Sequence, residues 1–143
     1  MPARILIADD NPQNADLLGE YLGDEYEVTI ASDGDETLER VRSFQPDVLL
    51  LDIMMPKLSG FEVCKRLKAD AKTRQLPVLM ITALDQPSDI DRAVEAGTDD
   101  FLTKPIHRTE LLNRVRALIA SRRSPDAVEQ ALTYMEAVER GDA

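Results

Sequence analysis

The amino-acid sequence predicts an α/β fold in which a single parallel sheet is covered by helices on both faces. Short apolar segments alternate with helical patterns five times along the chain, and this alternation is typical of parallel sheets with helical crossovers. The strongest apolar segment, residues 48–51, is a continuous aliphatic run, as expected for a strand buried on both faces. In such doubly wound folds, ligands and chemistry gather at the carboxyl ends of the strands.

The first two predicted strands flank a helix that starts at Asn11 and Pro12. Residues 5–8 are aliphatic and lead directly into Asp9 and Asp10, so we expect both carboxylates at the end of a buried strand. Asparagine caps a first helical turn and proline fits inside it. The apolar stripe of this helix comprises Ala15, Leu18, Tyr21 and Leu22. Residues 26–31 alternate apolar and polar side chains, which predicts a second, more exposed strand.

Residues 32–52 predict a helix followed by the central strand. Asp33, just before the helix, and Glu36 have the spacing of a capping box. The buried stripe of this helix comprises Leu38 and Val41. The strand over residues 48–51 then ends at Asp52. Capping a helix or a turn is the common role of an aspartate in this place, so a functional role for Asp52 depends on what else lies at the same edge.

The second half of the chain repeats the pattern. Ser59 and Gly60 start a helix in which Cys64 lies on the apolar stripe, so we expect Cys64 in the core rather than in a redox role. Residues 77–81 predict the fourth strand and residues 98–102 the fifth. The helix between them carries Ile90, Ala93 and Val94 and ends at Gly97. The apolar stripe of the fifth helix comprises Leu111, Leu112, Val115, Leu118 and Ile119.

Length and composition are those of one globular domain. The chain has 143 residues, 43% of them hydrophobic and 31% charged, which is enough for a core of its own. Its net charge of -10 would repel nucleic-acid phosphates, so we expect no direct nucleic-acid binding. The single cysteine excludes an internal disulfide and suits a reducing compartment. No apolar run approaches the ~20 residues of a membrane span, so we expect a cytoplasmic protein without membrane contact.

Acidic and polar side chains end several of the predicted strands and should meet at one edge of the sheet. Asp9 and Asp10 follow the first strand, Asp52 the third, Thr82 the fourth and Lys104 the fifth. Three carboxylates form a hard-oxygen site that suits Mg²⁺. Once a metal neutralises the acids, Lys104 and the Thr82 hydroxyl lack an anionic partner, and a phosphoryl group on Asp52 would supply one.

Four sequence blocks resemble the receiver domains of two-component response regulators, over about residues 4–121: IADDN (7–11), LDIMMP (51–56) with Ser59-Gly60, ITA (81–83) and LTKP (102–105). The resemblance implies a flavodoxin-like sheet with strand order 2-1-3-4-5. It implies that Asp52 accepts a phosphoryl group from a histidine kinase or a histidine phosphotransfer protein. It also implies that Asp9, Asp10, Asp52 and the backbone carbonyl of Met54 hold Mg²⁺.

The resemblance further implies a switch. Thr82 would bind the phosphoryl oxygens with Lys104, and Phe101 would turn inward as Thr82 moves. Ala83 would leave room for the phosphoryl group, and the Lys104-Pro105 bond would be cis. The responsive surface would be the fourth helix, fifth strand and fifth helix, where a homodimer could form through reciprocal ion pairs of Asp91, Arg92, Asp99, Asp100, Arg114 and Arg116.

An enzyme is the main alternative, because haloacid-dehalogenase-like phosphatases also use an aspartate nucleophile, threonine, lysine and Mg²⁺. Those enzymes have a second aspartate two residues after the nucleophile as general acid and base, whereas Met54 follows Asp52 and Asn11 follows Asp9 at that spacing. A flavin-binding flavodoxin is disfavoured because the chain has no tryptophan. In receiver domains, the residues two positions after the acceptor and two after the threonine flank the path of the attacking water. Here these positions hold Met54 and Leu84, which are both apolar, so the resemblance implies slow hydrolysis of the phosphorylated form.

The carboxyl-terminal part of the chain departs from the alternating pattern. We expect a receiver domain over residues 1–121 and a helical extension or linker over residues 122–143, with a helix over residues 126–138. That helix would lead to an output domain or dock on a partner. Several blocks resemble receivers found before cyclic-di-GMP output domains. His107, the only histidine, lies at the start of a helix, where we expect a surface or capping role rather than a phosphohistidine relay. We therefore expect the phosphodonor to be another protein.

Overall fold

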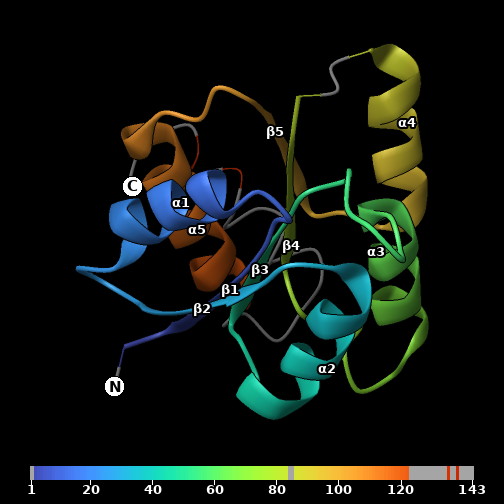
Figure 1. Cartoon of the computed structure of the whole chain (residues 1–143), viewed down its shortest axis with the longest axis horizontal. Helices are drawn as coiled ribbons and strands as arrows, with labels where there is room; N and C mark the ends of the chain where they lie inside the picture. Colours follow the sequence, from blue (N-terminus) through green and yellow to red (C-terminus); the bar gives the residue numbers. More distant parts are fainter. Residues whose placement is uncertain (1, 84–85, 123–134, 136–137, 139–143) are drawn as a thin grey trace.

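The structure, a computed structural model, describes residues 2–83, 86–122, 135 and 138. Five parallel strands form one sheet of order β2-β1-β3-β4-β5 (Figure 1), which confirms the predicted fold class and strand order. The strands are β1 (Arg4–Ala8), β2 (Glu27–Ala31), β3 (Val48–Leu51), β4 (Val78–Thr82) and β5 (Asp100–Thr103). The helices are α1 (Pro12–Leu22), α2 (Gly34–Phe44), α3 (Gly60–Ala69), α4 (Pro87–Ala96) and α5 (Arg108–Arg122).

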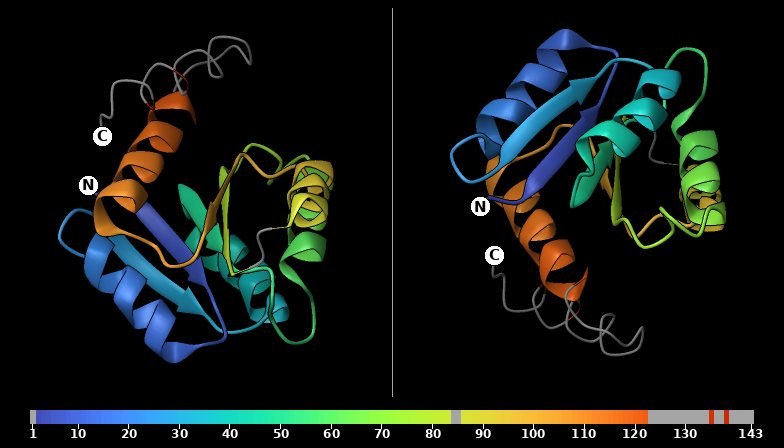
Figure 2. Two further views of the ribbon diagram at one scale, coloured as in Figure 1. Left: turned by 90° about the horizontal axis from the view of Figure 1, so that it is seen from above. Right: turned by 90° about the horizontal axis from the view of Figure 1, so that it is seen from below.

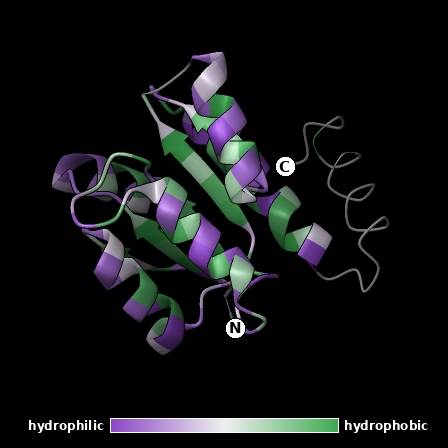
Figure 3. Cartoon of the chain, turned by 90° about the vertical axis from the view of Figure 1, so that its right-hand side faces the viewer, coloured by the Kyte–Doolittle hydropathy of each residue, from purple (hydrophilic) through white to green (hydrophobic). Residues whose placement is uncertain are grey.

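The sheet separates two hydrophobic cores. α1 and α5 cover one face, and α2, α3 and α4 cover the other (Figures 1 and 2). Side chains of β1 and β3 alternate between the two cores, so Ile5, Ile7 and Leu50 face α1 and α5, while Leu6 and Leu49 face the other layer. The aliphatic runs therefore need no polar alternation, and Figure 3 shows the strands as mostly hydrophobic between helices with a hydrophilic outer side.

The helices begin and end where the sequence indicates. The side chain of Asn11 accepts hydrogen bonds from two backbone N–H groups of α1. Asp33 and Ser59 cap α2 and α3 in the same way, which satisfies donors that the first turn leaves free. Gly97 ends α4 with φ 93°, in the left-handed region that glycine adopts without strain. The side chain of Glu36 returns to the backbone N–H of Ser32 rather than to that of Asp33.

Some apolar residues of α4 and β2 are exposed. Ile90 and Val94 of α4 are 42% and 67% exposed, and the buried residues of that helix are Ala93 and Ala96. Ile30 is exposed because β2 lies at the edge of the sheet. Cys64 is fully buried among core side chains, as predicted, and burial raises the pKa of its thiol to about 11.

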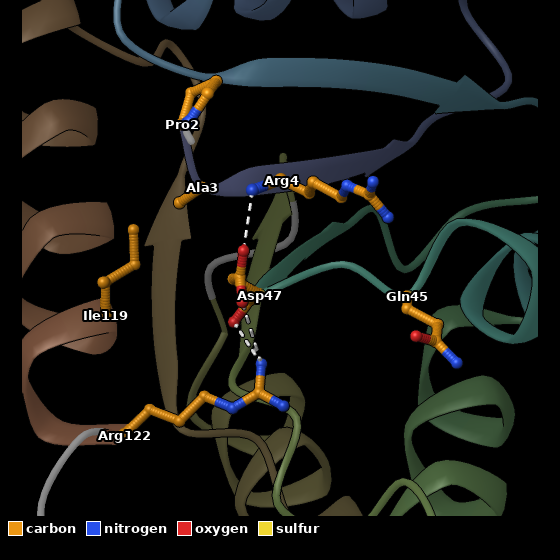
Figure 4. Close-up of a pocket in the computed structure, with 7 residues that line it drawn as sticks. All are labelled: Pro2, Ala3, Arg4, Gln45, Asp47, Ile119 and Arg122. Atoms are coloured by element: carbon orange, nitrogen blue, oxygen red, sulfur yellow. Dashed lines mark hydrogen bonds and ion pairs between the residues drawn. The ribbon is translucent and has the colours of Figure 1, made fainter.

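The end of α5 is fixed to the start of β3, at the amino-terminal edge of the sheet. Arg122 donates hydrogen bonds to the backbone carbonyls of Pro46 and Asp47. The Asp47 carboxylate accepts the backbone N–H of Arg4, so Asp47 contacts both arginines (Figure 4). Arg4, Asp47 and Arg122 border a pocket of about 410 Å³. Since Asp47 precedes β3 and Asp52 follows it, this pocket lies at the edge opposite to the acidic residues.

The predicted extension is almost entirely outside the described residues. Of the helix expected over residues 126–138, the structure describes only Met135 and Val138, both helical. The boundary between residues 121 and 122 therefore stays a prediction. Within the described part of the chain, no helix has the length and apolar character needed to cross a membrane.

Candidate functional site

The parallel sheet brings the predicted site residues to one edge. Asp9 follows β1, Asp52 follows β3, Thr82 ends β4 and Lys104 follows β5. Backbone hydrogen bonds continue the ladder past the strands, from Asp52 N–H to the Ala8 carbonyl at 2.9 Å and from Lys104 N–H to the Thr82 carbonyl at 2.8 Å. The in-register strands thus fix where each side chain starts.

Three carboxylates form a cluster at this edge. One oxygen each from Asp9, Asp10 and Asp52 lie within 4.8 Å of one another. Asp9 and Asp52 are only 2% and 6% exposed, whereas Asp10 is exposed. Each buried carboxylate accepts a hydrogen bond from the backbone N–H two residues later, from Asn11 at 2.9 Å and from Met54 at 3.0 Å. These bonds orient the two buried carboxylates.

Lys104 joins the two buried carboxylates. Its Nζ lies 3.0 Å from Asp52 Oδ2 and 3.3 Å from Asp9 Oδ2. Burial raises the pKa of Asp52, and this effect outweighs the Met54 N–H and Lys104, which both lower it. Burial opposes the charged form of Lys104, but its hydrogen bond and ion pair with Asp52, together with Asp9, raise its pKa. Lys104 is therefore held as a cation.

The cluster fits a divalent metal ion. Lys104 pairs with two of the three clustered carboxylates, Asp9 and Asp52. Both of these acids are buried, and uncompensated negative charge is costly in a buried environment. Carboxylate oxygens are hard ligands that suit cations such as Mg²⁺. Met54 donates its N–H to Asp52 and its side chain is 63% exposed. The predicted role of the Met54 carbonyl as a further ligand stays a prediction.

The predicted switch residues Thr82 and Phe101 lie on β4 and β5. Thr82 is fully buried at the end of β4. Phe101 is partly buried on β5 and packs against the core beneath α2, α3 and α4. Ala83 is exposed, and the Lys104-Pro105 peptide bond is cis, as predicted. Leu84 lies outside the described residues.

An apolar pocket next to the acids was not predicted. A cleft of about 620 Å³ contains the acidic cluster and the loop after β3. A neighbouring pocket of about 520 Å³ is bordered by α1 and the loop before α5, with Leu17, Tyr21 and Ile106 among its residues. Asn14 and Lys104 border both. The available signal was Leu17, which is apolar but lies off the buried stripe of α1.

Five of the six charged residues expected to pair across a dimer already have contacts within the chain. Arg114 lies 3.3 Å from Asp100, and Asp99 lies 2.9 Å from Lys68. Arg116 pairs with Glu25. The guanidinium of Arg92 lies 4.1 Å from the centre of the Phe61 ring. Reciprocal pairs between two copies would have to replace these contacts, so dimerisation stays a prediction. His107 is exposed, as expected.

Comparison with known proteins gives a consistent family match. The family model of the response regulator receiver domain matches residues 5–116. The DNA-binding dual master transcriptional regulator RpaA of a Synechocystis strain is 43% identical over 141 residues, which cover 96% of this chain and 56% of RpaA. Response regulator PleD of Caulobacter vibrioides is 49% identical over 119 residues, which cover 82% of this chain and 26% of PleD. The chain thus spans about half or less of these relatives.

A solved receiver domain with a similar fold contains a metal ion. The receiver domain of the sensor histidine kinase PA1611 from Pseudomonas aeruginosa superposes with a TM-score of 0.77 at 28% identity, over 83% of this chain and 98% of that domain. A magnesium ion is coordinated in the active-site cleft of that protein.

Proposed function

The chain belongs to the response regulator receiver domain family of two-component systems, and from this membership we propose that it is a switch phosphorylated on Asp52. The observation that carries the proposal is the buried carboxylate of Asp52 at the carboxyl end of the central strand, with Lys104 Nζ at 3.0 Å. A buried cation beside a nucleophile stabilises the negative charge that a phosphoryl group brings.

In the proposed reaction, a carboxylate oxygen of Asp52 attacks the phosphorus of a phosphohistidine on a histidine kinase or a histidine phosphotransfer protein. The new P–O bond forms as the P–N bond breaks, and the imidazole nitrogen keeps the electron pair and takes a proton from solvent. Lys104 then pairs with the phosphoryl oxygens, and the Thr82 hydroxyl donates a hydrogen bond to one of them.

The cofactor in this proposal is Mg²⁺, held by Asp9, Asp10, Asp52 and the Met54 carbonyl. When bound, it would neutralise the carboxylates and draw electron density from the phosphoryl oxygens. The closeness of the three carboxylates supports the assignment, as does the magnesium ion in the related domain of PA1611. The backbone N–H groups of Asn11 and Met54 keep Asp9 and Asp52 oriented before the ion arrives.

The proposed output of phosphorylation is a change on the face made by α4, β5 and α5. Thr82 would move towards the phosphoryl group, and the partly buried ring of Phe101 would turn into the space that it leaves. Ile90 and Val94 already form an exposed apolar strip on α4, which suits an interface for a homodimer or another partner.

The apolar pocket beside Lys104 is the proposed docking place for the phosphodonor. Leu17, Tyr21 and Ile106 border it, and it shares Asn14 and Lys104 with the acidic cleft. A helix of a kinase or phosphotransfer protein could bury apolar side chains there and present its phosphohistidine to Asp52.

Receiver domains of response regulators are generally signalling switches, and we propose that this chain, too, is not an enzyme that turns over phosphate. Among the described residues that border the acidic cleft, no carboxylate or histidine is present beyond the cluster itself, so a general base for water is lacking. The site of action would be the cytoplasm. The chain spans only part of RpaA and PleD. We propose that a further domain or a partner, reached through residues 122–143, supplies the output. An output through cyclic-di-GMP is one such case.

Acetyl phosphate in Mg²⁺ provides the experiment for this proposal. We expect the chain to gain one phosphoryl group by intact-protein mass spectrometry and to gain none without Mg²⁺. Asp52→Asn should remain unlabelled. Normal labelling of the variant would refute the assignment of Asp52.

A further inference from the structure

The loop between β3 and α3, residues 52–59, is closed tightly at its α3 end. The N–H of Gly60 donates to the Ile53 carbonyl at 2.8 Å. A Cβ atom at Gly60 would lie 2.4 Å from the Asp52 carbonyl oxygen, so the start of α3 is in direct contact with the backbone of the phosphoacceptor. The loop therefore cannot shift towards α3, and its position depends on what supports its other side.

That other side rests on the first turn of α2. A Cβ atom at Gly34 would lie 2.4 Å from Leu58 Cβ and 2.7 Å from the Leu58 carbonyl oxygen. The N–H of Gly34 points to the Pro56 carbonyl at 3.4 Å. Gly34 has no left-handed backbone angle, so glycine is required there by the close approach of the loop.

An ion pair reinforces the same contact. Lys57 Nζ lies 3.4 Å from Asp33 Oδ2, while Asp33 Oδ1 accepts the backbone N–H of Glu36 at 2.8 Å. One carboxylate thus caps α2 and holds the loop. The hydrogen bond from Glu36 N–H and the nearness of Lys57 lower the pKa of Asp33, so it stays ionised. Lys57 has φ 71°, in the left-handed region that residues other than glycine seldom adopt.

We propose that Asp33 and Gly34 are positioning residues for the metal site, because they support the loop that carries Asp52 and Met54, two residues that would hold Mg²⁺. The inference rests on the proposed function. Neither residue touches the acidic cluster. Their effect passes through Leu58 and Lys57 to the loop backbone, much as outer contacts orient the ligands of other metal sites.

Mg²⁺ binding measured by isothermal titration calorimetry tests the proposal. In Gly34→Ala, the added methyl group must displace Leu58, so we expect the dissociation constant for Mg²⁺ to rise about tenfold. Phosphorylation by acetyl phosphate should recover at saturating Mg²⁺. Gly19→Ala is the matched control, because nothing lies within 4 Å of the Cβ position at Gly19, and its Mg²⁺ affinity should equal that of the wild type.

A second pair of variants keeps the test independent of folding. Lys57→Gln removes the charge and keeps a long side chain at the same backbone angle, so Mg²⁺ affinity should fall about threefold. Lys57→Arg should restore it. Circular dichroism establishes which variants are folded. Wild-type affinity in folded Gly34→Ala overturns the inference, and so does wild-type affinity in Lys57→Gln if Gly34→Ala does not fold. In either case, loss of labelling in Asp52→Asn would leave the proposed function standing.

Discussion

At the scale of single residues, Asp52 carries opposing demands. It is buried and lies close to Asp9, yet it must be ionised to act as a nucleophile. Lys104 meets part of this demand with an ion pair to each buried carboxylate. The raised pKa of Asp52 indicates that the folded chain without metal still disfavours its charge.

Asp52→Asn should therefore stabilise the metal-free fold at neutral pH. The pKa of Asp52 is higher in the folded state than in the unfolded chain. The fold therefore loses stability as pH rises from the unfolded-state pKa to the folded-state pKa of this group. The amide avoids that loss, and we expect a gain of about 1 kcal/mol at pH 7 that disappears as pH falls towards ~4. Urea unfolding of both proteins across this range measures it. A variant less stable than wild type at pH 7 would contradict this explanation.

Met54 should influence how long the phosphoryl group survives. Its exposed side chain borders the acidic cleft and offers no group that orients water. We expect the isolated phosphorylated chain to lose phosphate over minutes or longer in Mg²⁺, and Met54→Glu to lose it up to about tenfold faster. Phosphate release followed after removal of the phosphodonor measures both rates. Decay of the wild type within seconds would show that Met54 does not protect the phosphoryl group.

At the scale of elements, the sequence located strands and helices to within about two residues because capping and turn residues mark their ends. Asn11, Asp33, Ser59 and Gly97 all act at the boundaries where the sequence placed them. Periodicity indicates which residues share a face but does not indicate whether another element covers that face. Ile90 and Val94 have the apolar spacing of a shared face on α4, yet both are exposed.

The end of α4 gives a prediction about stability. Gly97 has φ 93°, and a Cβ atom there would lie 2.9 Å from Lys68 Cγ. The Nζ of Lys68 bonds the Leu76 carbonyl at 2.7 Å and Asp99 at 2.9 Å, so its side chain is not free to yield. We expect Gly97→Ala to lower the free energy of unfolding by about 1–2 kcal/mol.

Urea unfolding measures this effect. Gly19→Ala is again the control, since alanine favours the helix interior and nothing obstructs it in α1. Equal stability of Gly97→Ala and wild type would mean that the chain accommodates the methyl group and that the left-handed angle is not required.

At the scale of the whole molecule, the sheet is the frame of the site. The four strands β1, β3, β4 and β5 each end at one of its residues. The residues that meet at this edge could be predicted because the ends of the strands can be recognised in the sequence. Parallel strands then bring their carboxyl ends to the same edge of the sheet. The support from α2 could not, because the contact of Gly34 with Leu58 depends on how a loop packs in space. The apolar pocket beside Lys104 was missed for the same reason.

Different groups lie at the two edges of the sheet. The acidic cluster lies at the carboxyl edge, and Arg122 fixes the end of α5 to the α2–β3 connection at the amino edge. β3 connects the two, from Asp47 to Asp52.

Locating the phosphoryl group on the chain tests the central claim most directly. After reaction with acetyl phosphate in Mg²⁺, reduction with borohydride converts a phosphorylated aspartate to homoserine, which peptide mass spectrometry can locate. We predict homoserine at position 52 and unmodified aspartate at positions 9 and 10. Homoserine at Asp9 or Asp10 with Asp52 intact, or no conversion in a chain that binds Mg²⁺, would contradict the assignment of Asp52 as the phosphoacceptor.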